Sequence, residues 1–145
     1  MSHVVAMDLS IQSIASLSDA CQMIGLELVK GQLTYKWWGR SVGDYPIPQG
    51  MKASELGKCL HAIRIPDNKN AYEIGVVQNK QDGGFSLVYD FYGAAGQAMQ
   101  SKVGQTGGLL KQAYSIARAK KEAQKKGMRT LLKKKQNGNM LLEVY

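Results

Sequence analysis

Nine basic residues gather in one eighteen-residue stretch of the chain. They are Arg118, Lys120, Lys121, Lys125, Lys126, Arg129, Lys133, Lys134 and Lys135, and Glu122 is the one acid among them. The other 127 residues carry ten basic and ten acidic side chains, so the net charge of +8 belongs to this stretch. A local field of this kind attracts polyanions, either nucleic acid or an acidic protein surface. A solvated lysine-rich face with no partner is the alternative.

The spacing of the cations suits contacts with phosphates. A helix expected over residues 109–126 places Lys111, Arg118 and Lys125 on its polar face, and residues 133–135 lead into an Asn-Gly turn. Lysine outnumbers arginine seven to two in the basic stretch, which favours point-charge contacts over bidentate contacts with base edges. Such binding weakens steeply as salt rises. The candidate anion-binding residues are Lys111, Arg118, Lys121, Lys125, Lys126, Arg129, Lys133, Lys134 and Lys135.

Aromatic residues beside basic ones form a second candidate site. Tyr35, Trp37 and Trp38 stand next to Lys36 and Arg40. On a strand, Tyr35 and Trp37 would share one face, and Trp38 would lie with Lys36 on the other. An outward tryptophan beside two cations could stack a nucleic-acid base. Packing in the core or at an edge is the alternative, and Trp37 and Trp38 are the candidate stacking residues.

The side chains that could perform catalysis or hold a metal are few and scattered. Asp90 is a carboxylate inside an apolar strand, and His3 and His61 each stand alone, so the spacing pairs no nucleophile with a base. A four-ligand zinc site would need both histidines together with Cys21 and Cys59, which lie far apart. We therefore expect no metal, no cofactor and no catalytic residue.

A glycine-rich segment, residues 104–108, precedes the long helix and raises the question of a phosphate loop. Helix N-termini bind anions, but no Gly-Lys-Ser or Gly-Lys-Thr follows and no strand leads directly into the segment. We interpret it as the turn that starts the helix.

The apolar pattern predicts the elements that carry these residues. Strands are expected over residues 4–9 and 60–65, with hairpins formed by 26–29 and 33–38 and by 72–78 and 85–92. In the strand 85–92, alternation buries Phe85, Leu87, Tyr89 and Phe91 and turns Asp90 to the opposite face.

Helices are expected over residues 14–24 and 109–126. Ser13 caps the first, Gly25 and Gly127 end the two, and Cys21 falls on the apolar stripe of the first. A shorter helix is expected within residues 93–108. Segment 39–57 shows no periodicity and holds two prolines, so we expect a long irregular loop and the least ordered internal segment.

The last eighteen residues, 128–145, are expected to form a hairpin joined to the main sheet. Its Asn-Gly turn is the preferred two-residue connection and would pair Gln136 with Asn139 and Leu131 with Val144. The whole chain, 1–145, is expected to be a single α+β domain: an antiparallel β-sheet with two main helices packed on one face. The basic helix and hairpin occupy residues 109–145.

No apolar run is long enough to cross a membrane. The opening Met-Ser-His-Val-Val-Ala-Met-Asp lacks a basic leader followed by an apolar stretch. We therefore expect a cytoplasmic protein with no membrane partner.

Several segments together resemble a known family. They are the opening Met-Ser-His, the strand FSLVYDFYG at 85–93, the helix beginning LLKQAY at 109, and the closing hairpin ending LLEVY. This set resembles the domain-of-unknown-function family 1257, which includes a hypothetical plastid reading frame with cyanobacterial, bacterial and phage relatives. The resemblance covers the element order over most of the chain, and segment 39–57 is less typical of the family.

The resemblance implies a small cytosolic or plastid-stromal α+β protein with no established activity. It carries over no catalytic residue. Genes for some relatives lie near ATPase or ferredoxin genes, which suggests accessory roles.

Taken together, the sequence predicts a non-catalytic small binding protein that contacts an anionic partner, preferably nucleic acid, through residues 109–145. An accessory subunit that docks on a larger enzyme or ATPase is the first alternative. A binder of a small molecule or nucleotide, with segment 39–57 as a lid over the sheet, is the second.

Overall fold

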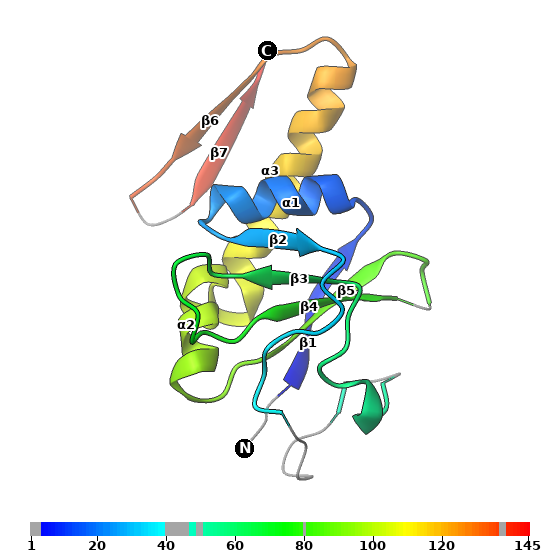
Figure 1. Cartoon of the computed structure of the whole chain (residues 1–145). Coiled ribbons are helices and arrows are strands. Elements are labelled where there is room, and N and C mark those ends of the chain that lie inside the picture. Colours follow the sequence, from blue (N-terminus) through cyan, green and yellow to red (C-terminus); the bar gives the residue numbers. More distant parts are fainter. Residues whose placement is uncertain (1–3, 40–46, 49–50, 80, 137–138) are drawn as a thin grey trace.

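The computed structural model describes residues 4–39, 47–48, 51–79, 81–136 and 139–145. Five strands form one antiparallel sheet in the order β1-β5-β4-β3-β2, and two more form a separate ribbon (Figure 1). The strands are β1 (Val4–Ile11), β2 (Glu27–Lys30), β3 (His61–Arg64), β4 (Ile74–Gln78), β5 (Phe85–Asp90), β6 (Thr130–Lys134) and β7 (Met140–Val144).

Three helices complete the fold over the described residues. They are α1 (Ile14–Met23), α2 (Gly93–Val103) and α3 (Gly108–Lys125), with short 3-10 turns at Ala53–Glu55 and Gln105–Gly107. The α+β class with the main helices on one face of an antiparallel sheet is confirmed. Within the described part of the chain, no helix has both the length and the apolar composition needed to span a membrane.

The ends of α1 and α3 follow the capping signals in the sequence. The Ser13 hydroxyl accepts a hydrogen bond from the N–H of Ser16 at 3.1 Å, as an N-cap does. Gly25 and Gly127 adopt φ of 78° and 72°, and each closes a Schellman motif in which the next N–H bonds back to the helix. Both glycine stops are therefore confirmed.

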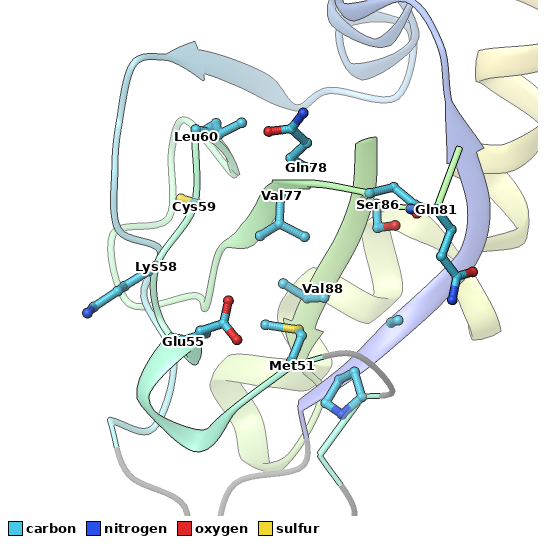
Figure 2. Close-up of a pocket in the computed structure, with 13 residues that line it drawn as sticks. Met51, Glu55, Lys58, Cys59, Leu60, Val77, Gln78, Gln81, Ser86 and Val88 are labelled. Atoms are coloured by element: carbon cyan, nitrogen blue, oxygen red, sulfur yellow. The ribbon is translucent and has the colours of Figure 1, made fainter. Parts of the chain in front are cut away.

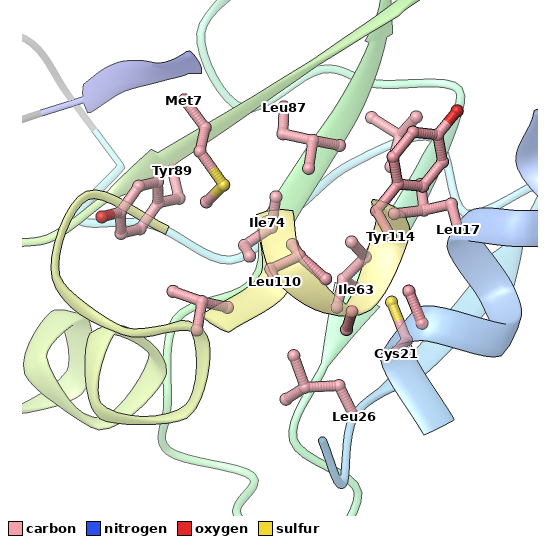
Figure 3. Packing of buried hydrophobic residues seen from close by; sticks show 14 of the residues in the cluster. Met7, Leu17, Cys21, Leu26, Ile63, Ile74, Leu87, Tyr89, Leu110 and Tyr114 are labelled. Atoms are coloured by element: carbon pink, nitrogen blue, oxygen red, sulfur yellow. The ribbon is translucent and has the colours of Figure 1, made fainter. Parts of the chain in front are cut away.

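The main core lies between the sheet and the helices (Figure 3). Leu17 and Cys21 of α1 and Leu110 of α3 are fully buried against Ile74 and Leu87 of the sheet. The Tyr114 hydroxyl of α3 also accepts hydrogen bonds from the backbone N–H groups of residues 12 and 13, at 2.9 and 3.2 Å. These bonds fix the connection between β1 and α1 to the middle of α3.

The predicted burial of strand 85–92 holds. Leu87 and Tyr89 are buried in the main core, Phe85 and Phe91 are partly buried against it, and Asp90 lies on the opposite face. That opposite face has a core of its own, in which Tyr35, Leu56 and Cys59 pack on Ala62 and Val88. Segments before β3 therefore cover the side of the sheet that the helices leave open.

The predicted hairpin between 26–29 and 33–38 is wrong. Strand β2 pairs with β3, with Val29 opposite Ala62, and residues 33–38 contribute only an isolated bridge between Thr34 and Lys58. The reason is tertiary: the Tyr35 ring lies over the face of β4 at Gly75, where the missing side chain makes room for it. The segment therefore crosses the sheet instead of extending it.

Much of segment 39–57, namely residues 40–46 and 49–50, lies outside the described residues. The prediction of an irregular loop is wrong for the last part of this segment, which is packed. It contains the 3-10 turn Ala53–Glu55, and Met51 and Leu56 contact the second core. The expectation of low order for the other residues stays a prediction.

The closing hairpin is present, but two predicted details are wrong. It forms its own two-stranded sheet and does not join the main one, because Gly127 turns the chain back along α3. Its register is shifted by one residue: Leu131 pairs with Glu143, and the Lys135 N–H donates to the Asn139 carbonyl at 2.7 Å. Three residues, 136–138, therefore connect the strands; 137 and 138 lie outside the described residues.

Candidate anion-binding surface

The closing hairpin, here called the basic ribbon (129–135 with 139–145), has two different faces. Successive side chains on a strand point to opposite sides, and the observed register puts the even-numbered residues of both strands on one face. On this inner face Leu132 and Leu142 are partly buried, and Met140 packs against the main core. The ribbon also contacts α3. Its inner face thus attaches the ribbon to the body.

The outer face of the basic ribbon carries the odd-numbered residues. They are Arg129, Leu131, Lys133 and Lys135 on one strand, and Asn139, Leu141, Glu143 and Tyr145 on the other. Backbone bonds between Arg129 and Tyr145, at 2.6 and 2.9 Å, extend the ladder beyond β6 and β7. Three cations therefore share one exposed face with three apolar side chains.

Several predicted anion-binding residues already have partners. Lys121 Nζ lies 3.7 Å from Asp19 of α1, Lys125 Nζ lies 3.7 Å from Glu122, and Lys133 Nζ lies 2.9 Å from Glu143. The side chains in all three ion pairs are exposed by at least a third. Exposed pairs of this kind contribute little stability, so each lysine can leave its carboxylate and bind another anion.

Lys134 has a structural partner of a different kind. Its Nζ donates to the backbone carbonyl of Met23 at 3.0 Å, where a cation suits the negative end of the α1 dipole. This contact holds the tip half of the basic ribbon against the end of α1, so we assign Lys134 to anchoring the ribbon.

The remaining cations of the stretch are exposed and form no ion pair with any residue that the structure describes. They are Arg118, Lys120, Lys126, Arg129 and Lys135. Lys120 was not among the candidate anion-binding residues. Its position inside the basic stretch 118–135 was the sequence feature that could have identified it. These five exposed side chains lie on α3 and the ribbon, and they are the cations of the stretch without an acidic partner among the described residues.

Lys111 does not belong to this surface. It lies fourteen residues before Lys125 on α3, about 21 Å along the helix axis. There it is partly buried and lines a hollow beside β1 with Asp8, Gln105 and Thr106. The distance separates Lys111 from the basic ribbon, and anion binding by Lys111 stays a prediction.

Trp37 and Trp38 lie on the face of the sheet opposite the helices. Trp37 is partly buried, packs with the second core and lies over Gly57. The backbone N–H of Trp38 donates to Asp90 Oδ2 at 3.2 Å. The structure does not bring either tryptophan to the basic ribbon, and it gives the Trp37 side chain a packing role; base stacking by Trp37 and Trp38 stays a prediction.

The buried carboxylate and the described histidine also have structural partners. Asp90 is fully buried, and its carboxylate also accepts a hydrogen bond from the Tyr92 N–H at 3.0 Å. His61 Nδ1 accepts one from the Gly31 N–H at 3.0 Å. His3 lies outside the described residues. Over the described ranges, no group of three or more His, Cys, Asp or Glu side chains is arranged to hold a metal ion.

A hollow of about 480 Å³ opens on the second face of the sheet (Figure 2). Val77 and Val88 form its floor, Met51 and Glu55 border it on the side of the 3-10 turn, and Ser86 lies across from them. The sequence suggested segment 39–57 as a lid over the sheet, but no sequence feature predicted the position of the hollow.

Neither cysteine is poised for chemistry. Cys59 borders the hollow, and burial raises the pKa of its thiol to about 11. Burial in the main core raises the pKa of the Cys21 thiol to about 12. Both groups therefore stay protonated at neutral pH, and thiolate nucleophiles are not available.

Comparison with protein-family models, with curated proteins and with solved structures found no match. The resemblance to family 1257 therefore stays a prediction.

Proposed function

We propose that the protein is a non-catalytic nucleic-acid-binding protein that uses the basic ribbon together with the C-terminal half of α3. The observation that carries the proposal is the set of five exposed cations without an acidic partner among the described residues, on two segments that pack together. Contacts from such side chains to phosphates supply affinity and position.

The shape of the segment favours nucleic acid over an acidic protein surface. A two-stranded antiparallel ribbon is narrow enough to enter a groove or to lie along a strand. On it Lys133 and Lys135 follow one another at about 6.8 Å, the two-residue repeat of a strand, with Arg129 further along the same line. A row of cations along one strand fits a polymer that carries a row of anions.

Salt dependence tests the proposal. We expect the intact protein to retain a fluorescent oligonucleotide at low salt and to lose it as salt rises. Five phosphate contacts predict a slope of log K against log salt of about −3.5 on single strands and about −4.5 on duplex. Fluorescence anisotropy over a salt series measures this slope.

No binding at low salt would contradict the proposal. A shallow slope would favour the alternative of an accessory subunit, because a mixed protein interface releases few counterions. The same titration, run against the oligonucleotide and against a polyglutamate chain, separates a nucleic-acid partner from an acidic peptide partner.

A second candidate function rests on the hollow over the sheet. Its volume of about 480 Å³ lies within the usual range of small-molecule sites, and its apolar floor with a few polar groups at the border is typical of them. This observation favours a small-molecule or nucleotide binder, with part of segment 39–57 over the site.

Filling the hollow tests this candidate. Ala6 is exposed and lines the hollow, so Ala6→Trp should occupy it with little change in the melting temperature of the free protein. We expect one of the four common nucleoside monophosphates to raise the melting temperature of the wild type and not that of the variant. If no nucleotide raises the melting temperature of the wild type, or if the wild type and the variant respond alike, the hollow is not a nucleotide site.

A further inference from the structure

Three large apolar side chains are exposed on the outer face of the basic ribbon. Leu131 is 45% exposed, Leu141 is 46% exposed and Tyr145 is 64% exposed. They do not hold the ribbon in place, because the inner face does so through Met140 in the core and Lys134 on the end of α1. Neighbouring exposed apolar groups of this kind mark a surface that binds something.

The pairing of the strands places a charge beside each of these apolar groups. Arg129 lies opposite Tyr145, Lys133 lies opposite Leu141, and Leu131 lies opposite Glu143. Side chains directly opposite one another on a ribbon lie about 5 Å apart. Two of these charges, Arg129 and Lys133, are positive, and the acid Glu143 is already paired with Lys133. A ligand that covers this face must therefore offer anionic and apolar groups in close alternation.

Single-stranded nucleic acid offers that alternation and duplex does not. In a duplex the flat faces of the bases are stacked inside, so the apolar side chains would meet phosphates and sugar. In a single strand each phosphate is followed by a base whose face is free to stack on a side chain. Resting on the function proposed above, we infer that the outer face of the basic ribbon binds single-stranded nucleic acid in preference to duplex.

Each side chain then has a distinct part in binding. Tyr145 stacks a base, with its backbone held by two hydrogen bonds to Arg129, and Leu141 provides an apolar contact for the next base. Arg129, Lys133 and Lys135 contact phosphates. Lys133 exchanges its exposed pair with Glu143 for a phosphate. Because the ribbon is fixed to α1 and the core, little ordering is needed when the ligand binds.

The experiment compares single strand and duplex on the full chain. Anisotropy is measured with an oligothymidine of about 20 nucleotides and with a duplex of the same length, each long enough for one site. We expect the single strand to bind at least about tenfold more tightly at equal salt, as one or two stacked bases would give. The preference should be tested at a salt concentration where both are retained.

Variants assign the preference to the outer face. Tyr145→Ala combined with Leu141→Ser should weaken single-strand binding about tenfold or more and leave duplex binding within about twofold. Tyr145→Phe keeps the ring and should bind as the wild type does. Leu33→Ser is the matched control, since Leu33 is 65% exposed but lies on the segment that covers the second face of the sheet. Circular dichroism and melting temperature confirm that each variant is folded.

The outcomes are distinguishable. Duplex bound as tightly as single strand would overturn this inference and leave the proposed function standing. No retention of either nucleic acid would overturn both. A vesicle of phosphatidylcholine and phosphatidylserine serves as the third arm, because exposed apolar and basic groups also suit an anionic lipid surface. Retention on vesicles without retention of the oligothymidine would assign the outer face to lipid and overturn the inference.

Discussion

Reversing Arg118, Lys126, Arg129 and Lys135 to glutamate should abolish nucleic-acid binding while the protein stays folded. The four changes take the net charge from +8 to zero and replace four of the five cations without an acidic partner by carboxylates. We expect affinity for every sequence to fall about a hundredfold or more, with a flatter salt slope, because phosphate contacts are lost. None of the four forms an ion pair with a described residue and all are exposed, so each should change stability by about 0.5 kcal/mol or less.

A matched variant separates the position of the charge from its amount. Reversing Lys30, Lys52, Lys58 and Lys69 gives the same net charge, and these residues are also exposed without an ion pair to a described residue. They lie outside the basic ribbon and α3, so we expect this variant to lose less than about tenfold in affinity through the long-range field alone. Equal losses in both variants would show that overall charge, and not a site on the ribbon and α3, governs binding.

The elements with strong local signals could be predicted from the sequence. Hairpin β4–β5 alternates apolar residues around a Gly-rich turn, and α3 has an apolar stripe ending at Gly127, so neighbours in the chain determine both. Residues 33–38 show the limit of this reasoning. They have the composition of a strand, but the space above Gly75 lets Tyr35 pack across the sheet, and no local pattern contains that information.

The hairpin of residues 128–145 was predicted from local pattern, but its register was not. The strands are connected by three residues and not by two, which changes the residues that pair across the hairpin. A shift of the register by one residue moves every side chain of a strand to the opposite face. In the observed register Leu132, Leu142 and Met140 share the inner face, where they meet the body. Contacts with α3 and the core therefore select the register over the preferred turn.

The charge cluster was visible in the sequence, but the roles of its members were not. Lys121 meets Asp19 from another helix, Lys134 meets the end of α1, and Lys111 lies at the other end of α3. Only the fold separates these from the cations without an acidic partner. The outward position of Tyr145 and Leu141 depended on the register in the same way.

Gly96 lies at a place in α2 that reverses the usual effect of glycine in a helix. Glycine to alanine in a helix normally stabilises by about 1 kcal/mol. A β-carbon at Gly96 would lie 2.7 Å from the carbonyl oxygens of Asp90 and Phe91 and closer still to the Phe91 carbonyl carbon. Backbone cannot move aside as a flexible side chain can, so we expect Gly96→Ala to lower the free energy of unfolding by about 2 kcal/mol or more.

Gly108 is the matched control for this substitution. It begins α3 with φ of −59° and ψ of −38°, and a β-carbon there would meet nothing within 4 Å. Gly108→Ala should therefore raise the free energy of unfolding by about 0.5 kcal/mol or more, because the unfolded chain loses freedom. Urea denaturation of the three proteins measures both effects. A Gly96→Ala protein as stable as the wild type would show that α2 does not pack tightly on the end of β5. The absence of a side chain at Gly96 would then not be required for α2 to pack against the backbone of Asp90 and Phe91.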